Sequence, residues 1–105
     1  MTKKERGRSR NLAPLISGRA RRIVVAELLQ RDGGDCFYCL RPMGADCTVE
    51  HLHRWADGGS NHPGNLALAH RACNWNTKDL TVDQKMLRRG DALLSRLREE
   101  ERAAA

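Results

Sequence analysis

The chain has 105 residues, of which 40% are apolar but only 4% aromatic, so it forms one domain at most and has few large side chains for a core. Its net charge of +6 favours a polyanionic partner, and the absence of an apolar run of about 20 residues excludes a membrane-spanning helix. The basic N-terminus also lacks the apolar segment of a signal peptide, so we expect a protein of the reducing cytoplasm.

The N-terminal segment carries most of the positive charge. Residues 1–22 contain eight lysines and arginines against one acidic residue, which leaves the rest of the chain close to neutral. We expect residues 1–16, which are rich in Lys, Arg, Ser and Gly, to form a flexible basic arm. A solvated tail and a nucleic-acid-binding arm both fit this composition. We favour nucleic acid because a candidate site for a phosphate group lies later in the chain. Ser17 is a candidate N-cap for a helix over residues 18–31.

Two pairs of residues have the spacing of metal ligands. Cys36 and Cys39 form the first pair, and His70 and Cys73 form the second. Two ligands with two residues between them can reach one ion from a single turn, and a second such pair completes a tetrahedron. A disulfide framework would need no histidine at this spacing, so the pattern predicts a closed, structural Zn²⁺ site rather than a set of buried thiols. Cys47 fits neither pair and is expected to be a small, partly buried side chain.

The residues between the two pairs alternate between strand and loop signals. Thr48 and Val49 favour a strand over residues 47–50, and the run Leu-Ala-Leu-Ala favours a second strand over residues 66–69. Residues 52–64 contain three glycines and a proline, which predicts a long loop. A loop of this length is more often functional than a mere connection.

Two helices are expected in the C-terminal part. The first covers residues 71–78, and the capping-box residues Thr81 and Gln84 open the second. We expect Gly90 to break this second helix in two. Several leucines share one face of it, and we expect this face to be core, with a docking surface as the alternative; they are Leu80, Leu87, Leu93, Leu94 and Leu97.

The sequence between the first helix and Lys78 resembles the HNH endonucleases, in the zinc-containing branch common in phages and bacteria. Besides the two ligand pairs, the shared features are Glu50-His51, Gly58-Gly59, Asn65-Leu66 and Asn74, in the same order. The resemblance implies an α+β fold, with a small ββα-metal core and a structural zinc site, flanked by an N-terminal and a C-terminal helix. We therefore assign 1–16 to the arm, 17–80 to an HNH nuclease domain and 81–105 to a C-terminal helical extension.

The resemblance also assigns roles to individual residues. His51 is expected to be the general base, and Asn65 to orient the loop and this histidine. Glu50 and Asn74 are expected to bind a catalytic divalent cation, Mg²⁺ or another. The chemistry agrees, because an imidazole with a pKa of about 6.5 is largely neutral at pH 7 and can accept a proton from water. Each residue also has a plain alternative as an ion pair, a loop cap or a helix-surface residue, but as a set they favour catalysis.

Several basic residues are candidates for contacts with phosphate; they are Arg54, Lys78, Arg19, Arg21 and Arg22. The sequence thus predicts a metal-dependent DNA endonuclease of low sequence specificity, because phosphate contacts position a protein without reading bases. One alternative is a non-catalytic, zinc-containing module that binds nucleic acid. Another is a nuclease subunit of a phage DNA-packaging assembly, with terminase subunits as partners. Four positions depart from the family pattern: Glu50 stands where Asp is commoner, Leu40 replaces a usual Gly, Arg54 replaces a usual Pro, and Thr77 stands where the family has a basic residue, with Lys78 one position further.

Overall fold

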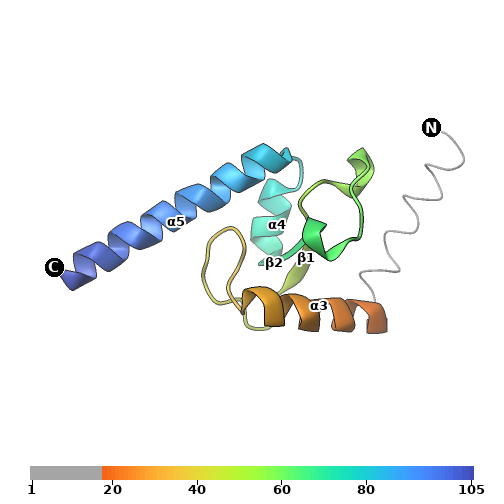
Figure 1. Ribbon diagram of the computed structural model, residues 1–105, viewed down its shortest axis with the longest axis horizontal. Coiled ribbons are helices and arrows are strands. Elements are labelled where there is room, and N and C mark those ends of the chain that lie inside the picture. Colours follow the sequence, from red (N-terminus) through yellow and green to blue (C-terminus); the bar gives the residue numbers. More distant parts are fainter. Residues whose placement is uncertain (1–17) are drawn as a thin grey trace, which may run out of the picture.

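The computed structural model describes residues 18–105 and shows helices arranged around a small two-stranded sheet (Figure 1). This arrangement confirms the predicted α+β class. The expected basic arm at 1–16 and the expected cap at Ser17 lie outside the described residues. The helices and strands, in chain order, are α3 (Gly18–Asp32), β1 (Thr48–His51), β2 (Leu66–Ala69), α4 (Arg71–Thr77) and α5 (Val82–Ala104), with short 3₁₀ turns at Trp55–Asp57 and Pro63–Asn65.

The sheet lies at the centre of the fold. Strand β1 pairs with β2 in antiparallel register, with Val49 opposite Leu68 and His51 opposite Leu66. All four residues of β2 are buried, as expected for a short, continuous apolar run. The core around the sheet also includes Leu28 of α3 and Met43 from the segment that precedes β1.

Helix α3 is attached to the sheet near its C-terminal end. It extends over the predicted residues 18–31 and one more, and Gly33 ends it in the left-handed conformation with φ +81°. Close to this end, the Arg31 guanidinium donates hydrogen bonds to the carbonyl oxygens of Pro63 and Leu66, at 2.7 and 2.8 Å. These bonds tie the helix to the start of β2.

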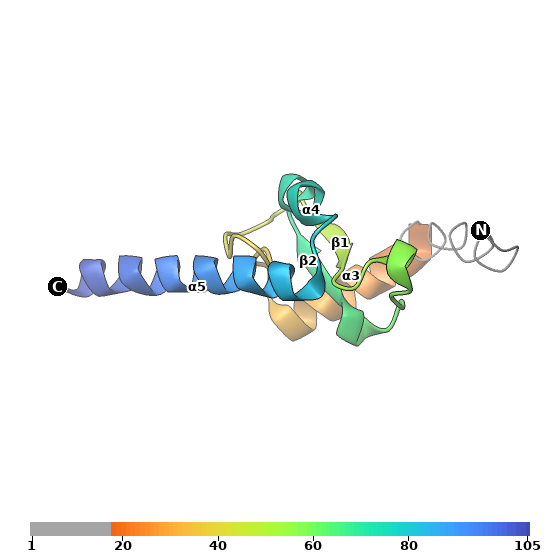
Figure 2. The ribbon, with the colours of Figure 1, turned by 90° about the horizontal axis from the view of Figure 1, so that it is seen from above.

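Helix α5 is one continuous helix, so the expected break at Gly90 is wrong. A glycine inside a helix costs roughly 1 kcal/mol relative to alanine, which is too little to interrupt a helix of this length. The predicted capping box is confirmed, because the Thr81 and Gln84 side chains each bond to the other residue's backbone N–H. Beyond its first turns the helix extends away from the sheet (Figures 1 and 2). Within residues 18–105, no helix combines the length and the apolar character needed to cross a bilayer.

Helix α5 contacts the rest of the fold through basic side chains, and its leucines face solvent. Arg89 donates to the Phe37 carbonyl oxygen at 2.7 Å, and Arg96 donates to that of Leu40 at 3.1 Å. Leu87 and Leu94 are 68% and 52% exposed, so the expectation that the leucine face is core is wrong. Helical periodicity identified the apolar face, but periodicity does not say which face meets a neighbour.

Candidate functional site

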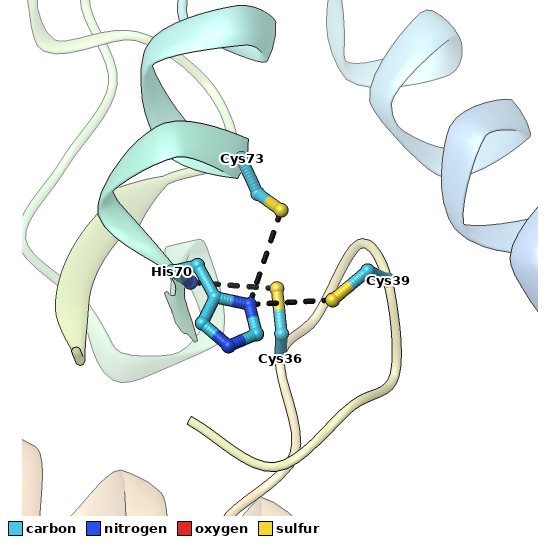
Figure 3. Close-up of side chains that lie close together, drawn as sticks. All are labelled: Cys36, Cys39, His70 and Cys73. Atoms are coloured by element: carbon cyan, nitrogen blue, oxygen red, sulfur yellow. Dashed lines mark hydrogen bonds between the residues drawn. The ribbon is translucent and has the colours of Figure 1, made fainter. Parts of the chain in front are cut away.

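The two predicted ligand pairs come together as one cluster (Figure 3). Cys36 and Cys39 lie on the turn after α3, whereas His70 and Cys73 lie at the start of α4. Their ligand atoms all lie within 4.8 Å of one another. A tetrahedral zinc ion holds its ligand atoms about 3.5–3.8 Å apart, given bonds of about 2.0–2.3 Å. The donor set of three thiols and one imidazole therefore fits a structural Zn²⁺ site, as predicted.

The histidine of this cluster is oriented for metal binding. The Nδ1 atom of His70 lies 3.2 Å from Cys39 Sγ, while its Nε2 atom is 3.1 Å from the Pro42 carbonyl oxygen. Because a carbonyl oxygen only accepts, Nε2 carries the proton, and the lone pair of the neutral ring is on Nδ1, toward the thiols. Leu40, which ends the turn, has φ +63°. The glycine that is usual here in the HNH endonucleases would adopt this left-handed conformation without strain, whereas Leu40 adopts it at a cost.

The thiols of the cluster differ in acidity. Burial opposes ionisation of Cys36, but hydrogen bonds from the backbone of Cys39, His70 and Tyr38 outweigh it and lower the pKa of this thiol to about 7. Burial, followed by the charges of Cys36 and Cys39, raises the pKa of Cys73 to about 12. Without a cation the cluster therefore resists full ionisation. A bound Zn²⁺ would remove the repulsion between the thiolates.

The imidazole of His51, at the end of β1, points toward the loop that follows. Its Nε2 atom lies 2.8 Å from Asn61 Oδ1, and its ring meets the edge of Trp55 at 6.1 Å between centroids. An amide oxygen only accepts, so Nε2 is protonated, and the lone pair of the neutral ring is on Nδ1. This tautomer leaves Nδ1 as the atom that can take a proton.

Asn65 holds the loop that carries these partners. Its Nδ2 group donates to the carbonyl oxygens of His53 and Ser60 at 3.0 and 2.8 Å, and its Oδ1 accepts from the His53 backbone N–H at 2.8 Å. One side chain thus fixes three backbone groups of the loop. Two glycines permit the same path: Gly58 has φ +97°, and a Cβ on Gly59 would lie 1.8 Å from the His53 carbonyl oxygen.

The carboxylate of Glu50 points into the interior and not toward the loop. Thr48 and Glu50 face α4, whereas His51 faces the loop, because neighbouring residues of a strand point to opposite sides. Glu50 is 4% exposed, and its Oε2 accepts a hydrogen bond from the Tyr38 hydroxyl at 2.9 Å. Burial, together with the charge of Glu50, raises the pKa of Tyr38, so this hydroxyl remains a donor.

Lys85 of α5 supplies the positive charge beside Glu50. Its side chain is fully buried, with Nζ 3.3 Å from Glu50 Oε1 and 2.8 Å from the His51 carbonyl oxygen. The structure therefore links Glu50 and His51 through one ammonium group, although it does not bring their side chains together. No local sequence signal indicated this residue, because its partners lie more than 30 residues away along the chain.

Asn74 lies on α4, against the same face of β1 as Glu50. Its Nδ2 group donates to Thr48 Oγ1 at 3.2 Å and to the Val49 carbonyl oxygen at 3.3 Å. The predicted ligands of a catalytic cation thus share one side of the strand. They do not fit such a cation in this packing, because the Glu50 carboxylate is buried and already paired with an ammonium group. Cation binding by Glu50 and Asn74 stays a prediction.

The predicted phosphate contacts occupy different surroundings. Arg19 and Arg22 are exposed on α3, but Arg21 is half-buried and donates to the Cys47 carbonyl oxygen at 2.7 Å. Arg54 forms ion pairs with Asp57 and Asp79, each at 3.5 Å.

Near α4, Lys78 lies 4.3 Å from the centroid of the Trp75 ring, which is 68% exposed. Arg19, Arg22 and Lys78 are thus the predicted residues most open to a ligand. Cys47, which was predicted to be partly buried, is half-buried and stands apart from the zinc cluster.

Sequence reasoning missed Asn61 and Lys85, which contact His51 and Glu50. Asn61 had a local signal, since it follows the Gly-Gly pair within the long loop. Lys85 had none of this kind.

In a comparison with protein families, a model described as HNH endonuclease matches residues 36–79. The match extends from the first zinc ligand to the residue before Leu80, so it includes β1, β2 and α4 but neither α3 nor α5. The comparison with curated proteins gave no match.

Proposed function

Residues 36–79 of the chain match the HNH endonuclease family, and on this premise we propose that the protein is a DNA endonuclease. The proposed reaction is hydrolysis of a phosphodiester bond by a water molecule that His51 deprotonates. A divalent cation would take part, as the family resemblance implies, and sequence specificity would be low. The proposed catalytic site lies at the C-terminal end of β1, where the loop begins.

The environment of His51 is the observation that carries this proposal. A general base must be neutral at the working pH, and its lone pair must be accessible. In the neutral ring, the hydrogen bond from Nε2 to Asn61 Oδ1 places the proton on Nε2 and leaves the lone pair on Nδ1. Asn65 fixes the backbone of the same loop, so the ring and its partner are held together before substrate binds.

Hydrolysis also requires that charge on the phosphate be neutralised. In the family this chemistry is supplied by a divalent cation, and the expected ligands in this chain are Glu50 and Asn74. We derive no step through such a cation, because Glu50 is paired with Lys85 in this packing. Exposed basic residues are the remaining source of positive charge, and we propose Arg19, Arg22 and Lys78 as contacts with the DNA backbone.

DNA is the proposed substrate because of charge and surface chemistry. The net charge is +6, and the exposed Trp75 ring beside Lys78 offers a stacking surface next to a cation. We also propose a reducing, cytoplasmic location, since the four cysteines are free thiols and three of them are needed as zinc ligands.

Nicking of supercoiled plasmid tests the proposal. The zinc-loaded protein would be assayed without added cation and then with Mg²⁺, Mn²⁺ or Ni²⁺, alongside His51→Ala and the exposed neighbour His53→Ala as a matched control. We expect nicking by the wild type and His53→Ala, and a loss of at least about 100-fold in His51→Ala, the usual contribution of a general base. Unchanged nicking by a highly purified His51→Ala protein that retains its zinc would overturn the proposal. Salt-sensitive DNA binding without nicking would instead identify a zinc-containing binding module.

A second candidate is a nuclease subunit of a larger assembly, such as a phage DNA-packaging complex with terminase subunits. The exposed leucines of α5 favour it, because apolar side chains in a row on a projecting helix are a common form of protein contact surface; they are Leu87, Leu93, Leu94 and Leu97. Co-purification with terminase subunits that is lost in Leu87→Lys/Leu94→Lys would support this role. Binding that is unaffected by these changes would remove it.

A further inference from the structure

Lys85 is a fully buried lysine placed next to the proposed catalytic strand. Its Nζ atom contacts the Glu50 carboxylate at 3.3 Å and the His51 carbonyl oxygen at 2.8 Å. A buried ammonium group is tolerated only when it is paired and hydrogen-bonded, and both conditions are met here. The contacts therefore explain how a lysine can be buried at this position.

The position of Lys85 within α5 points to Glu50 as the reason for its charge. Thr81 caps the helix, so Lys85 lies close to the N-terminal end, where the helix dipole disfavours a positive charge. Packing alone would favour an apolar residue in a fully buried position. Neither helix formation nor packing calls for a cation here, whereas the Glu50 carboxylate does.

Lys85 also lies outside the part of the chain that matches the family. The match ends at residue 79, and α5 begins at Val82. The N-terminal end of α5 lies beside α4 in both views of the ribbon, so a helix added after the nuclease core places its own cation against it (Figures 1 and 2). The side of β1 concerned is the one where Glu50 and Asn74 were expected to bind a metal.

We propose that Lys85 is the resident cation of Glu50, and that a divalent cation binds this carboxylate only when the ammonium group has left it. This inference deepens the proposed function, because it names the control of the same site, and it rests on Glu50 being the cation ligand. A divalent cation and an ammonium group repel each other at this range, so the two compete for one carboxylate.

Binding of Mn²⁺ to the zinc-loaded full chain tests the competition. We expect Lys85→Met to bind Mn²⁺ at least about tenfold more tightly than the wild type, a coupling of ordinary size. Arg88→Met is the matched control, since it removes one positive charge from an exposed position of the same helix, and its affinity should equal that of the wild type. The double variant Lys85→Met/Glu50→Gln should lose the gain. Lys85→Gln, which keeps a hydrogen-bond donor, replaces Lys85→Met if the latter does not retain zinc and helical circular dichroism.

Equal Mn²⁺ affinity in the wild type and in the folded Lys85 variant would overturn the inference. So would a gain that persists when Glu50 is replaced. The readout is binding, so it is separate from nuclease activity. A tenfold gain in a protein that does not nick plasmid would leave the inference standing and remove the proposed function, whereas nicking without any gain would do the reverse.

Discussion

The zinc cluster and the Glu50 pocket, by which we mean Glu50 with its partners Tyr38, Thr77 and Lys85, both use the segment after α3 and helix α4, yet they treat a cation in opposite ways. In the cluster, four ligand atoms from two distant pairs converge within 4.8 Å, and no lysine or arginine of residues 18–105 forms an ion pair or hydrogen bond with them. In the pocket, one carboxylate is paired with the buried ammonium group of Lys85. The first arrangement fits a metal ion, whereas the second already contains a cation. Ligand residues alone therefore do not define a metal site, because a basic side chain from elsewhere in the fold can take the metal's place.

The two regions are also connected. Tyr38, whose hydroxyl donates to Glu50, lies between the zinc ligands Cys36 and Cys39. Thr77, whose Oγ1 atom lies 3.3 Å from Glu50 Oε2, donates to the Cys73 carbonyl oxygen at 2.7 Å. Zinc would therefore hold in place the residues that surround Glu50.

Removal of zinc should cause the largest loss of stability. Structural zinc contributes roughly 10–16 kcal/mol of apparent binding free energy in small domains, and such domains unfold without it. We expect a strong chelator to abolish the cooperative thermal transition of the protein, and stoichiometric Zn²⁺ to restore it, as followed by circular dichroism. A chelated protein that keeps its transition would show that the cluster is not the structural centre.

Breaking the pair in the Glu50 pocket should have the next largest effect. Loss of one partner of a buried ion pair costs about 3–5 kcal/mol, because the other charge stays buried without compensation. In urea unfolding of the zinc-loaded protein, Lys85→Met should lower the free energy of unfolding by this amount, and Arg88→Met by much less.

The double variant Lys85→Met/Glu50→Gln should lose less stability than the sum of the two single changes, since no charge remains unpaired in it. Additive losses would mean that the two groups do not interact.

Tyr38→Phe tests the connection between the two regions. It removes a hydrogen bond to a charged acceptor, which costs about 1.5–3 kcal/mol in free energy of unfolding. Thr77→Ser keeps its hydroxyl group and should cost less. Zinc stoichiometry should be unchanged in both variants. A loss of zinc from Tyr38→Phe would contradict the view that this hydroxyl serves the Glu50 pocket.

The zinc affinity should depend on pH through the thiols. Burial raises the pKa of Cys73 to about 12 in the metal-free protein, so this thiol is protonated near neutral pH and must lose its proton when zinc binds. Lower pH therefore weakens zinc binding, by about tenfold per pH unit for each proton released. Cys36, with a pKa of about 7, adds a further proton release below pH 7. Competition with a chelator of known affinity measures this slope, and a flat profile between pH 6 and 8 would contradict it.

The sequence predicted the zinc cluster and the sheet well because their signals are local. The spacing of Cys36 and Cys39, and of His70 and Cys73, reports geometry within single turns. The short apolar run of β2 likewise reports its own burial. The sequence could not predict the Glu50–Lys85 pair, because 35 residues separate the two partners and only tertiary packing brings them together.

The same limit explains the error on α5. The spacing of its leucines predicted an apolar face correctly, but Arg89 and Arg96 contact the fold by donating to backbone carbonyl oxygens of Phe37 and Leu40. Arginine side chains on a helix are usually assigned to solvent, so composition pointed to the wrong face. The first turns after Thr81 were placed correctly because capping is a local signal.

Nuclear magnetic resonance of the lysine ammonium groups in the zinc-loaded wild type tests the pairing of Lys85 with Glu50 most directly. A buried, hydrogen-bonded ammonium exchanges its protons slowly with water, so Lys85 should give a resolved signal that is absent from Glu50→Gln and fades as Mg²⁺ is added. A Lys85 signal that is absent from the wild type, or that persists unchanged in Glu50→Gln, would contradict the account.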